Sequence, residues 1–382
     1  MQIAKIKVVG VGGGGSNMIE FLNTKGLKTV ETTIVNTDFQ ALETSSTKEK
    51  IQIGIKSTKG LGAGMIPAKG MEAAEENYDD LKEKLKGYDI VFIATGLGGG
   101  TGTGAAPIIA KVAKEVGALT IGVVTKPFLF EGKKRMALAE EGLSKLKEYT
   151  DSIIVIPNNK LTSIIDSSIG IKDAFKIVDE VLAKAVIGIS DVIQLHGTND
   201  VNLDFADVKT IMEYKGIALM GIGESKGENA AFMAIEKAVN SPLLEEINID
   251  GAMGILVNFY INPKYPLLDI TNSMNLIYEN VDENANVMFG TTTNESIPID
   301  EVKVTIIATG FEKNNINKNI YNNLETMKNY NITNVKELNN NNNNVDDKLS
   351  NIRQKLLNIS LPNHEDEQTL ENPSYKRFYS TK

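Results

Sequence analysis

The sequence contains no cysteine and no tryptophan, and only two of its 382 residues are histidine. Without cysteine the chain has no disulfides, thiolate zinc sites, iron–sulfur clusters or cysteine nucleophiles. The two histidines, His196 and His364, are too few to build a histidine metal site. We therefore expect any bound metal ion to have oxygen ligands.

Long apolar runs are also missing. The run Ile153–Ile156 is typical of the longest ones and is far shorter than a membrane span. Met1 leads almost directly into the strand-like segment 3–11, with no signal peptide or organelle transit peptide in between. The sequence thus predicts a cytoplasmic protein without direct membrane insertion.

Positive charge is in deficit. The chain has 40 Lys and Arg residues against 49 Asp and Glu residues, which gives a formal net charge of −9. This balance argues against a nucleic-acid partner held by bulk positive charge. The length favours two domains, and 42% apolar residues are enough to bury a sizeable core.

Glycine disappears near the end of the chain. All 33 glycines lie at or before Gly310, whereas 18 of the 51 residues from Lys313 to Asn363 are asparagine. Few residues of this segment are apolar, so their burial cannot offset the entropy that the chain would lose on ordering. We therefore expect a disordered linker over residues 313–369. Residues 370–382 concentrate aromatic and basic side chains, which is consistent with either a short docking peptide or a frayed tail.

Apolar, β-branched segments alternate with helical segments before residue 157, which indicates a parallel sheet covered on both faces. This α/β architecture is typical of nucleotide-binding domains. The expected strands are 6–11, 33–36, 90–95, 119–125 and 153–156, and the helices between them begin at 17, cover 68–86, follow 103 and cover 133–149.

The second half of the chain has a different pattern. From Asp173 to Ile193 apolar residues recur every three or four positions, which predicts one long buried helix that can join two lobes. The region that follows predicts a smaller α/β lobe. Its expected helices are 208–220 and 229–239, and its expected strands are 255–260, 287–291 and 302–308.

A first glycine-rich segment, Gly10-Val-Gly-Gly-Gly-Gly-Ser-Asn17, lies between a strand and a helix. In that context glycines let backbone amides approach a phosphate at the positive end of a helix. The segment also matches the G-x-G-x-x-G of dinucleotide folds, and Asp38 lies near the acidic position that would hold a ribose. A tight turn without any ligand is the other interpretation.

A second glycine-rich segment, Gly96-Leu-Gly-Gly-Gly-Thr-Gly-Thr-Gly104, again lies between a strand and a helix. Two phosphate loops on adjacent strands would wrap one polyphosphate from two sides, which a dinucleotide enzyme does not need. Neither loop contains the lysine of G-x-x-x-x-G-K-[ST]. Backbone amides, the hydroxyls of Thr101 and Thr103 and a bound Mg²⁺ ion would therefore offset the phosphate charge.

The segment 98–104 resembles the signature of the tubulin/FtsZ superfamily, and residues 3–312 are similar to bacterial-type FtsZ, the cell-division GTPase. The resemblance implies a Rossmann-like GTP-binding domain over 1–170, a central helix and catalytic loop over 171–206, and a smaller α/β C-terminal domain over 207–312. Other matching motifs are Val35-Asn-Thr-Asp38, Gly60-Leu-Gly-Ala-Gly64, Val124-Thr-Lys-Pro-Phe128, Phe130-Glu-Gly-Lys-Lys-Arg135, Ile156-Pro-Asn158, Leu219-Met-Gly-Ile-Gly223 and Ala308-Thr-Gly-Phe311.

The resemblance also implies which residues bind GTP or GDP. Asp179 can accept hydrogen bonds from N1 and N2 of guanine, whose hydrogens adenine lacks, so it would select the base. The implied binding residues are Gly13, Gly14 and Asn17 in the first loop, Gly100, Thr101, Gly102 and Thr103 in the phosphate loop, Glu131, Arg135 and Asn158 beside the ribose, and Phe175 and Asp179 at guanine.

The acidic segment Asn202-Leu-Asp-Phe-Ala-Asp207 is the catalytic candidate. Asp204 and Asp207 are one helical turn apart, so both carboxylates can point the same way. Such a pair can polarise a water molecule or help to place a cation, and it can also cap a helix. In the family this loop, with Asn202, completes the nucleotide site of the next subunit, which implies head-to-tail filaments and hydrolysis that depends on assembly.

The sequence therefore predicts a self-assembling, Mg²⁺-dependent GTPase of the cytokinetic ring at the division site. Membrane-anchoring and regulatory division proteins would bind the C-terminal peptide, although residues 371–377 match the family peptide only loosely. A non-hydrolysing GTP-dependent scaffold is a lesser alternative, which the intact Asp204 and Asp207 disfavour. An NAD-dependent oxidoreductase is another, which the second glycine loop disfavours. Met65-Ile66-Pro67 also departs from the family, which often has a small or polar pair there.

Overall fold

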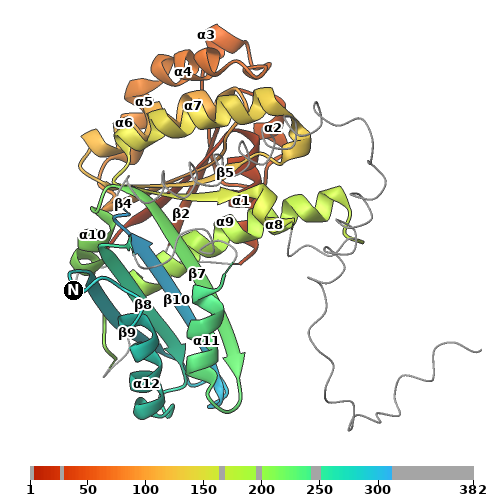
Figure 1. The fold of residues 1–382 in the computed structure, drawn as a ribbon. Coiled ribbons are helices and arrows are strands. Elements are labelled where there is room, and N and C mark those ends of the chain that lie inside the picture. Colours follow the sequence, from red (N-terminus) through yellow and green to blue (C-terminus); the bar gives the residue numbers. More distant parts are fainter. Residues whose placement is uncertain (1–3, 26–29, 163–167, 195–199, 242–250, 312–382) are drawn as a thin grey trace, which may run out of the picture. The chain divides into compact units, whose positions relative to one another are not determined.

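The computed structural model describes residues 4–25, 30–162, 168–194, 200–241 and 251–311. These residues form a ten-stranded sheet in the order β3-β2-β1-β4-β5-β6-β7-β10-β8-β9 (Figure 1). The linker and peptide expected over 313–382 lie outside the described residues. The strands are β1 (Ile6–Val11), β2 (Val30–Asn36), β3 (Glu49–Gln52), β4 (Ile90–Gly96), β5 (Leu119–Lys126), β6 (Ser152–Pro157), β7 (Gly216–Lys226), β8 (Gly254–Ile261), β9 (Asn286–Thr293) and β10 (Glu301–Thr309).

The part of the sheet from β3 to β7 is parallel throughout. Strand β10 then pairs antiparallel with both β7 and β8, and β9 pairs parallel with β8. The expected α/β fold with a parallel N-terminal sheet is confirmed. The helices are α1 (Gly12–Thr24), α2 (Phe39–Thr44), α3 (Ile55–Thr58), α4 (Pro67–Glu76), α5 (Tyr78–Leu85), α6 (Thr101–Glu115), η1 (Leu129–Glu131), α7 (Lys133–Tyr149), α8 (Asn158–Leu161), α9 (Ile171–Gln194), α10 (Phe205–Met212), α11 (Ala230–Val239) and α12 (Leu267–Tyr278).

Successive strand side chains point into two different helical layers. Val8 of β1 and Phe92 of β4 belong to a core with α1 and α9, whereas Val9 and Ile93 belong to a core with α6 and α7. Because both faces are buried, these strands are apolar at nearly every position, which is the pattern of a covered parallel sheet. A third core lies between α11, α12 and the strands β7, β8 and β10.

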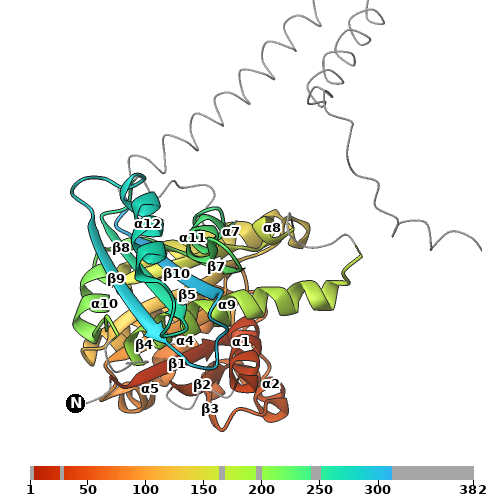
Figure 2. The ribbon, with the colours of Figure 1, turned by 90° about the horizontal axis from the view of Figure 1, so that it is seen from below.

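Helix α9 joins the two halves of the sheet (Figures 1 and 2). Its 24 residues extend about 36 Å at the usual helical rise. One cluster of buried side chains contains Leu182 and Ile189 of α9 together with Phe92 of β4 and Ile307 of β10. The expected long buried helix is confirmed, and it is the packing element shared by the two lobes.

One expected element is wrong. The sequence predicts a helix over 208–220, but α10 ends at Met212 and residues 216–226 form β7. This strand pairs with β6 on one side and β10 on the other, and a Cβ atom at Gly223 would lie 1.9 Å from the carbonyl oxygen of Ala234 in α11. Strand pairing and close helix packing thus override the local apolar spacing.

A smaller difference concerns a helix boundary. The helix expected over 68–86 is divided into α4 and α5 at Asn77, whose side-chain oxygen accepts a hydrogen bond from the Gly54 amide at 2.9 Å. None of the helices in the described ranges combines the length and apolar character of a membrane-spanning segment.

Candidate functional site

The two glycine-rich segments lie side by side at one edge of the sheet. Strands β1 and β4 pair in parallel, with Val11 opposite Thr95, so α1 and α6 begin at the same edge. Gly12 has a φ of 69°, a conformation that favours glycine, and a Cβ atom there would lie 2.9 Å from the Gly102 amide nitrogen. The expected adjacency of the two loops is confirmed.

The loops also leave open space beside the starts of α1 and α6. A Cβ atom at Gly13 or Gly99 would meet no heavy atom within 4 Å. At Gly102, in contrast, a Cβ atom would lie 2.3 Å from Thr95 Oγ1, and at Gly100 it would lie 2.8 Å from the Cβ of Ala63. The positive ends of two helix dipoles meet at this space. Its shape and its positive electrostatic potential therefore suit a phosphate group.

The two threonines of the phosphate loop have different surroundings. Thr103 is 2% exposed, and its hydroxyl accepts a hydrogen bond from the Gly98 amide at 2.8 Å. The Oγ1 atoms of Thr101 and Thr37 are hydrogen-bonded at 2.6 Å. Thr103 thus shapes the loop from within. Thr37 joins the site from the end of β2, a role that the sequence reasoning missed although Thr37 lies in a quoted motif.

Two buried polar atoms on the expected ribose side lack partners. Arg135 pairs with Glu131 at 2.7 Å, and Glu131 also accepts a hydrogen bond from the Phe128 amide at 2.8 Å. Within the described ranges, only Arg135 Nε, Asn158 Oδ1 and Ser190 Oγ are buried side-chain atoms with no hydrogen-bond partner. Unpaired buried polar atoms are costly, so Arg135 Nε and Asn158 Oδ1 mark positions where a ligand can supply the partners.

The start of α9 carries an aromatic ring and a carboxylate toward this edge. The Phe175 ring meets Phe128 edge-on at 5.4 Å, and Phe128 stacks on Phe130 at 5.1 Å. Asp179 is half-buried and has no hydrogen bond from the described residues, and burial raises its pKa to about 7. An uncompensated carboxylate beside aromatic rings can accept hydrogen bonds from a planar base.

Asp38 has a different role from the ribose contact that a dinucleotide enzyme would need. It is the N-cap of α2, and its carboxylate accepts a hydrogen bond from the Ala41 amide at 3.1 Å. This cap accounts for the acidic residue without a ligand.

The acidic segment forms a reciprocal cap on α10. Asp204 Oδ1 accepts a hydrogen bond from the Asp207 amide at 2.9 Å, and Asp207 Oδ2 accepts one from the Asp204 amide at 3.0 Å. Asn202 and Asp204 are exposed, and Asp207 is half-buried. Both carboxylates therefore lie on the same turn, as expected, and each has one oxygen outside the cap.

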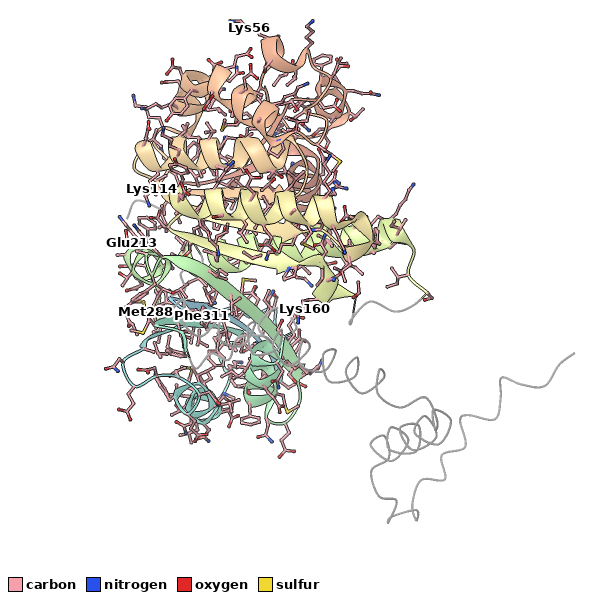
Figure 3. All side chains as sticks on the ribbon, turned by 45° about the horizontal axis from the view of Figure 1, so that its top comes forward. Lys56, Lys114, Lys160, Glu213, Met288 and Phe311 are labelled. Carbon is pink, nitrogen blue, oxygen red and sulfur yellow. The ribbon has the colours of Figure 1, made fainter. Side chains whose placement is uncertain are left out.

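This acidic segment lies at the sheet edge opposite the glycine loops. The Gln194 side chain at the end of α9 donates to the carbonyl of Ala4, just before β1, at 3.4 Å. Ser152, the first residue of β6, donates to the carbonyl of Met212 in α10 at 2.6 Å. Figure 3 shows the same separation, with Glu213 after α10 on one side and Lys160 of α8 on the other. The acidic segment and the glycine loops are thus at least the length of a strand apart, about 20 Å.

Comparisons with known proteins give consistent results. Residues 5–166 match the model of the Tubulin/FtsZ family GTPase domain, and residues 216–312 match the FtsZ family C-terminal domain. An empty FtsZ dimer from M. jannaschii is 44% identical, with 81% of this chain and 89% of that chain covered and a TM-score of 0.74. CetZ2 from Haloferax volcanii, in a GTPγS-bound protofilament, shares the fold at 19% identity, with 85% and 99% coverage and a TM-score of 0.72. The chain therefore belongs to the tubulin/FtsZ family of GTPases and has both domains of FtsZ.

Proposed function

We propose that the chain assembles head to tail into filaments and hydrolyses GTP to GDP and phosphate at the contact between subunits. The observation that carries this proposal is the separation of the glycine loops from Asp204 and Asp207 at opposite edges of one sheet. A group about 20 Å away cannot act on a phosphate bound by the same chain. A second copy stacked along the strand direction would bring its acidic segment to that phosphate.

The nucleotide would lie along the edge formed by the ends of β1, β4, β5 and β6. Guanine would stack against Phe175 and donate to Asp179, and the ribose would supply partners to Arg135 Nε and Asn158 Oδ1, with Glu131 holding the arginine. The phosphates would meet backbone amides and hydroxyls of Gly13, Gly14, Asn17, Gly100, Thr101, Gly102 and Thr103.

The acidic segment has the chemistry to activate water. Asp204 Oδ1 and Asp207 Oδ2 are used in the cap, which leaves Asp204 Oδ2 and Asp207 Oδ1 able to accept the protons of a water molecule. The reciprocal cap fixes the two carboxylates relative to each other, so helix capping and catalysis use different oxygens. The Asn202 side chain would help to orient the same water.

We also propose that Mg²⁺ accompanies the nucleotide. The described residues contain no group of three or more His, Asp or Glu side chains that could hold a metal ion. The phosphate oxygens would supply most of the ligands, and the paired hydroxyls of Thr37 and Thr101 lie beside the phosphate loop. Mg²⁺ would offset the phosphate charge that a lysine offsets in other nucleotide loops.

In the cell we propose that these filaments form the cytokinetic ring in the cytoplasm at the division site. The likeness to FtsZ supports this role. Residues 370–382 would act as a peptide for membrane-anchoring and regulatory division proteins, with residues 313–369 as the tether.

A mixing experiment tests the shared site. Asp204→Asn keeps a good N-cap but loses the charge, and Gly13→Glu places a carboxylate in the open space beside the phosphate loop. Each variant alone should hydrolyse GTP more slowly by ~10² or more. An equal mixture should recover about a quarter of wild-type turnover, because one contact in four joins a filled pocket to an intact acidic segment. Turnover equal to the sum of the two variants, with mixed filaments confirmed by light scattering, would contradict the proposal.

A further inference from the structure

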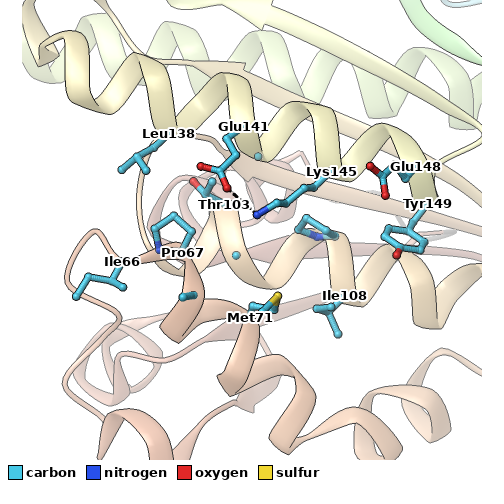
Figure 4. Close-up of a pocket in the computed structure, with 14 residues that line it drawn as sticks. Ile66, Pro67, Met71, Thr103, Ile108, Leu138, Glu141, Lys145, Glu148 and Tyr149 are labelled. Atoms are coloured by element: carbon cyan, nitrogen blue, oxygen red, sulfur yellow. Dashed lines mark hydrogen bonds and ion pairs between the residues drawn. The ribbon is translucent and has the colours of Figure 1, made fainter.

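A pocket lies between α4, α6 and α7 (Figure 4). Its volume is about 520 Å³, which falls in the range of small-molecule sites. Its wall reaches the phosphate loop through Thr103 and Gly104, and helix α7 forms the opposite side. Most of its remaining lining is apolar and consists of Ile66, Pro67, Met71, Pro107, Ile108 and Leu138.

Helix α7 gives the pocket a net negative charge. Glu141 pairs with Lys145 at 2.7 Å, whereas Glu148 has no hydrogen-bond or ion-pair partner among the described residues. Lys145 is the one basic residue among those that line the pocket, so it cannot neutralise both carboxylates. Figure 4 shows Glu148 beside Tyr149 at one end of the pocket and Leu138 at the other.

We propose that this pocket is a binding site for a small hydrophobic amine. The apolar body of the ligand would cover Met71, Ile108 and Leu138, and its ammonium group would lie between the Glu148 carboxylate and the Tyr149 ring. A carboxylate beside an aromatic ring is the pair of groups that attracts an organic ammonium ion. An anionic ligand of the same shape would meet the surplus carboxylate and be repelled.

Three probes of one shape test the charge preference in the full-length protein. Phenylbutylamine, phenylbutanol and phenylbutyrate have the same ring and chain and differ in their head group. In NMR or calorimetric titrations the amine should bind about fivefold more tightly than the alcohol, and the acid more weakly than both. Equal binding of the amine and the acid, or no binding of any probe, would overturn the proposal.

Variants assign the binding to this pocket. Glu148→Gln should lower the affinity for the amine to that for the alcohol, and it should leave the affinity for the alcohol unchanged. Glu75→Gln is the matched control, because it removes an exposed carboxylate on α4 that does not line the pocket. It should leave the affinities for all three probes unchanged. Ala68→Phe should fill the pocket and abolish binding of all three probes, with Leu138→Trp as a second blocking variant if the first unfolds. Equal effects of Glu148→Gln and Glu75→Gln would refute the assigned position.

A second copy of the chain is the other occupant that the test can identify. If Ala68→Phe reduced sedimenting assemblies while no amine bound the wild type, the pocket would be a contact between subunits and the proposal would be wrong. Failure of the mixing experiment on GTP turnover would leave this test unaffected, because the titrations need neither hydrolysis nor assembly.

Discussion

Asp179 should make GTP binding depend on pH near neutrality. Its pKa is raised to about 7 by burial, because no cation or hydrogen-bond donor among the described residues compensates the charge. Guanine donates hydrogen bonds from N1 and N2, so it binds the ionised carboxylate. Nucleotide binding should therefore lower this pKa and release protons at neutral pH.

The size of the effect follows from the fraction of ionised Asp179. With a pKa of about 7, roughly nine-tenths of the carboxylate is ionised at pH ~8 and roughly one-tenth at pH ~6. The apparent dissociation constant of GTP should then rise about tenfold from pH ~8 to pH ~6, because only the ionised fraction is competent to bind. Calorimetry at pH ~7 in buffers of different ionisation enthalpy should show release of about half a proton.

The variant Asp179→Asn is the control for the pH dependence of GTP binding, and its behaviour can refute the assigned role of Asp179. The γ-phosphate also titrates in this range, but its contribution is the same in both proteins, so the difference between the two pH profiles belongs to Asp179. The amide should also favour xanthosine triphosphate, whose C2 carbonyl can accept a hydrogen bond where guanine has an amino group. A variant with the wild-type pH profile and unchanged base preference would show that Asp179 does not contact the base.

Three further predictions concern base choice and buried charges. GTP should bind at least ~10² times more tightly than ATP in competition assays, because adenine would leave a buried acceptor unpaired. Asp191→Asn should raise the free energy of unfolding by about 1–2 kcal/mol in denaturant titrations at pH ~8, and this gain should vanish below pH ~4, because burial raises the pKa of Asp191 to about 6 despite the nearby Lys303. Glu49→Gln should lower the free energy of unfolding by about 2 kcal/mol, because the buried Lys7 ammonium would lose its nearer ion-pair partner and keep Glu31 at 3.8 Å. The wild type should lose this stability as the pH falls through about 2, which is the pKa of Glu49. Partial burial alone would raise this pKa, but hydrogen bonds from Lys7 and Thr33 and the positive charge of Lys7 lower it.

The sequence predicted the parallel half of the sheet better than the second lobe. Strands β1, β4, β5 and β6 are apolar because helices cover both of their faces. Their local composition is therefore enough to predict where they lie in the sequence. Strand β7 has apolar residues next to those of α10, and only its partners β6 and β10 distinguish it from a continued helix. That information lies more than 60 residues away in the chain, as the pairs Ser152 with Gly216 and Glu301 with Lys226 show.

The meeting of the loops was predictable because they follow neighbouring strands of the sheet. Parallel strands end at one edge, so the loops after β1, β4, β5 and β6 had to meet there. What the sequence could not reveal is which polar atoms lack partners. Arg135 Nε and Asn158 Oδ1 are buried and unpaired in the structure, although Arg135 Nη1 pairs with Glu131, and no local sequence pattern distinguishes these atoms.

Two glycines of the phosphate loops look alike in the sequence and differ in the structure. A Cβ atom at Gly104 would lie 1.9 Å from the carbonyl oxygen of Pro67, whereas one at Gly13 would meet nothing within 4 Å. Gly104→Ala should therefore lower the free energy of unfolding by about 1–3 kcal/mol through overpacking, with α4 displaced from α6. Gly13→Ala should leave that free energy equal or slightly higher, because alanine favours the helix, yet weaken GTP binding by filling the space beside the phosphates. Denaturant midpoints and GTP dissociation constants for both variants give the comparison. If Gly13→Ala bound GTP like the wild type, the open space at the start of α1 would not hold a phosphate.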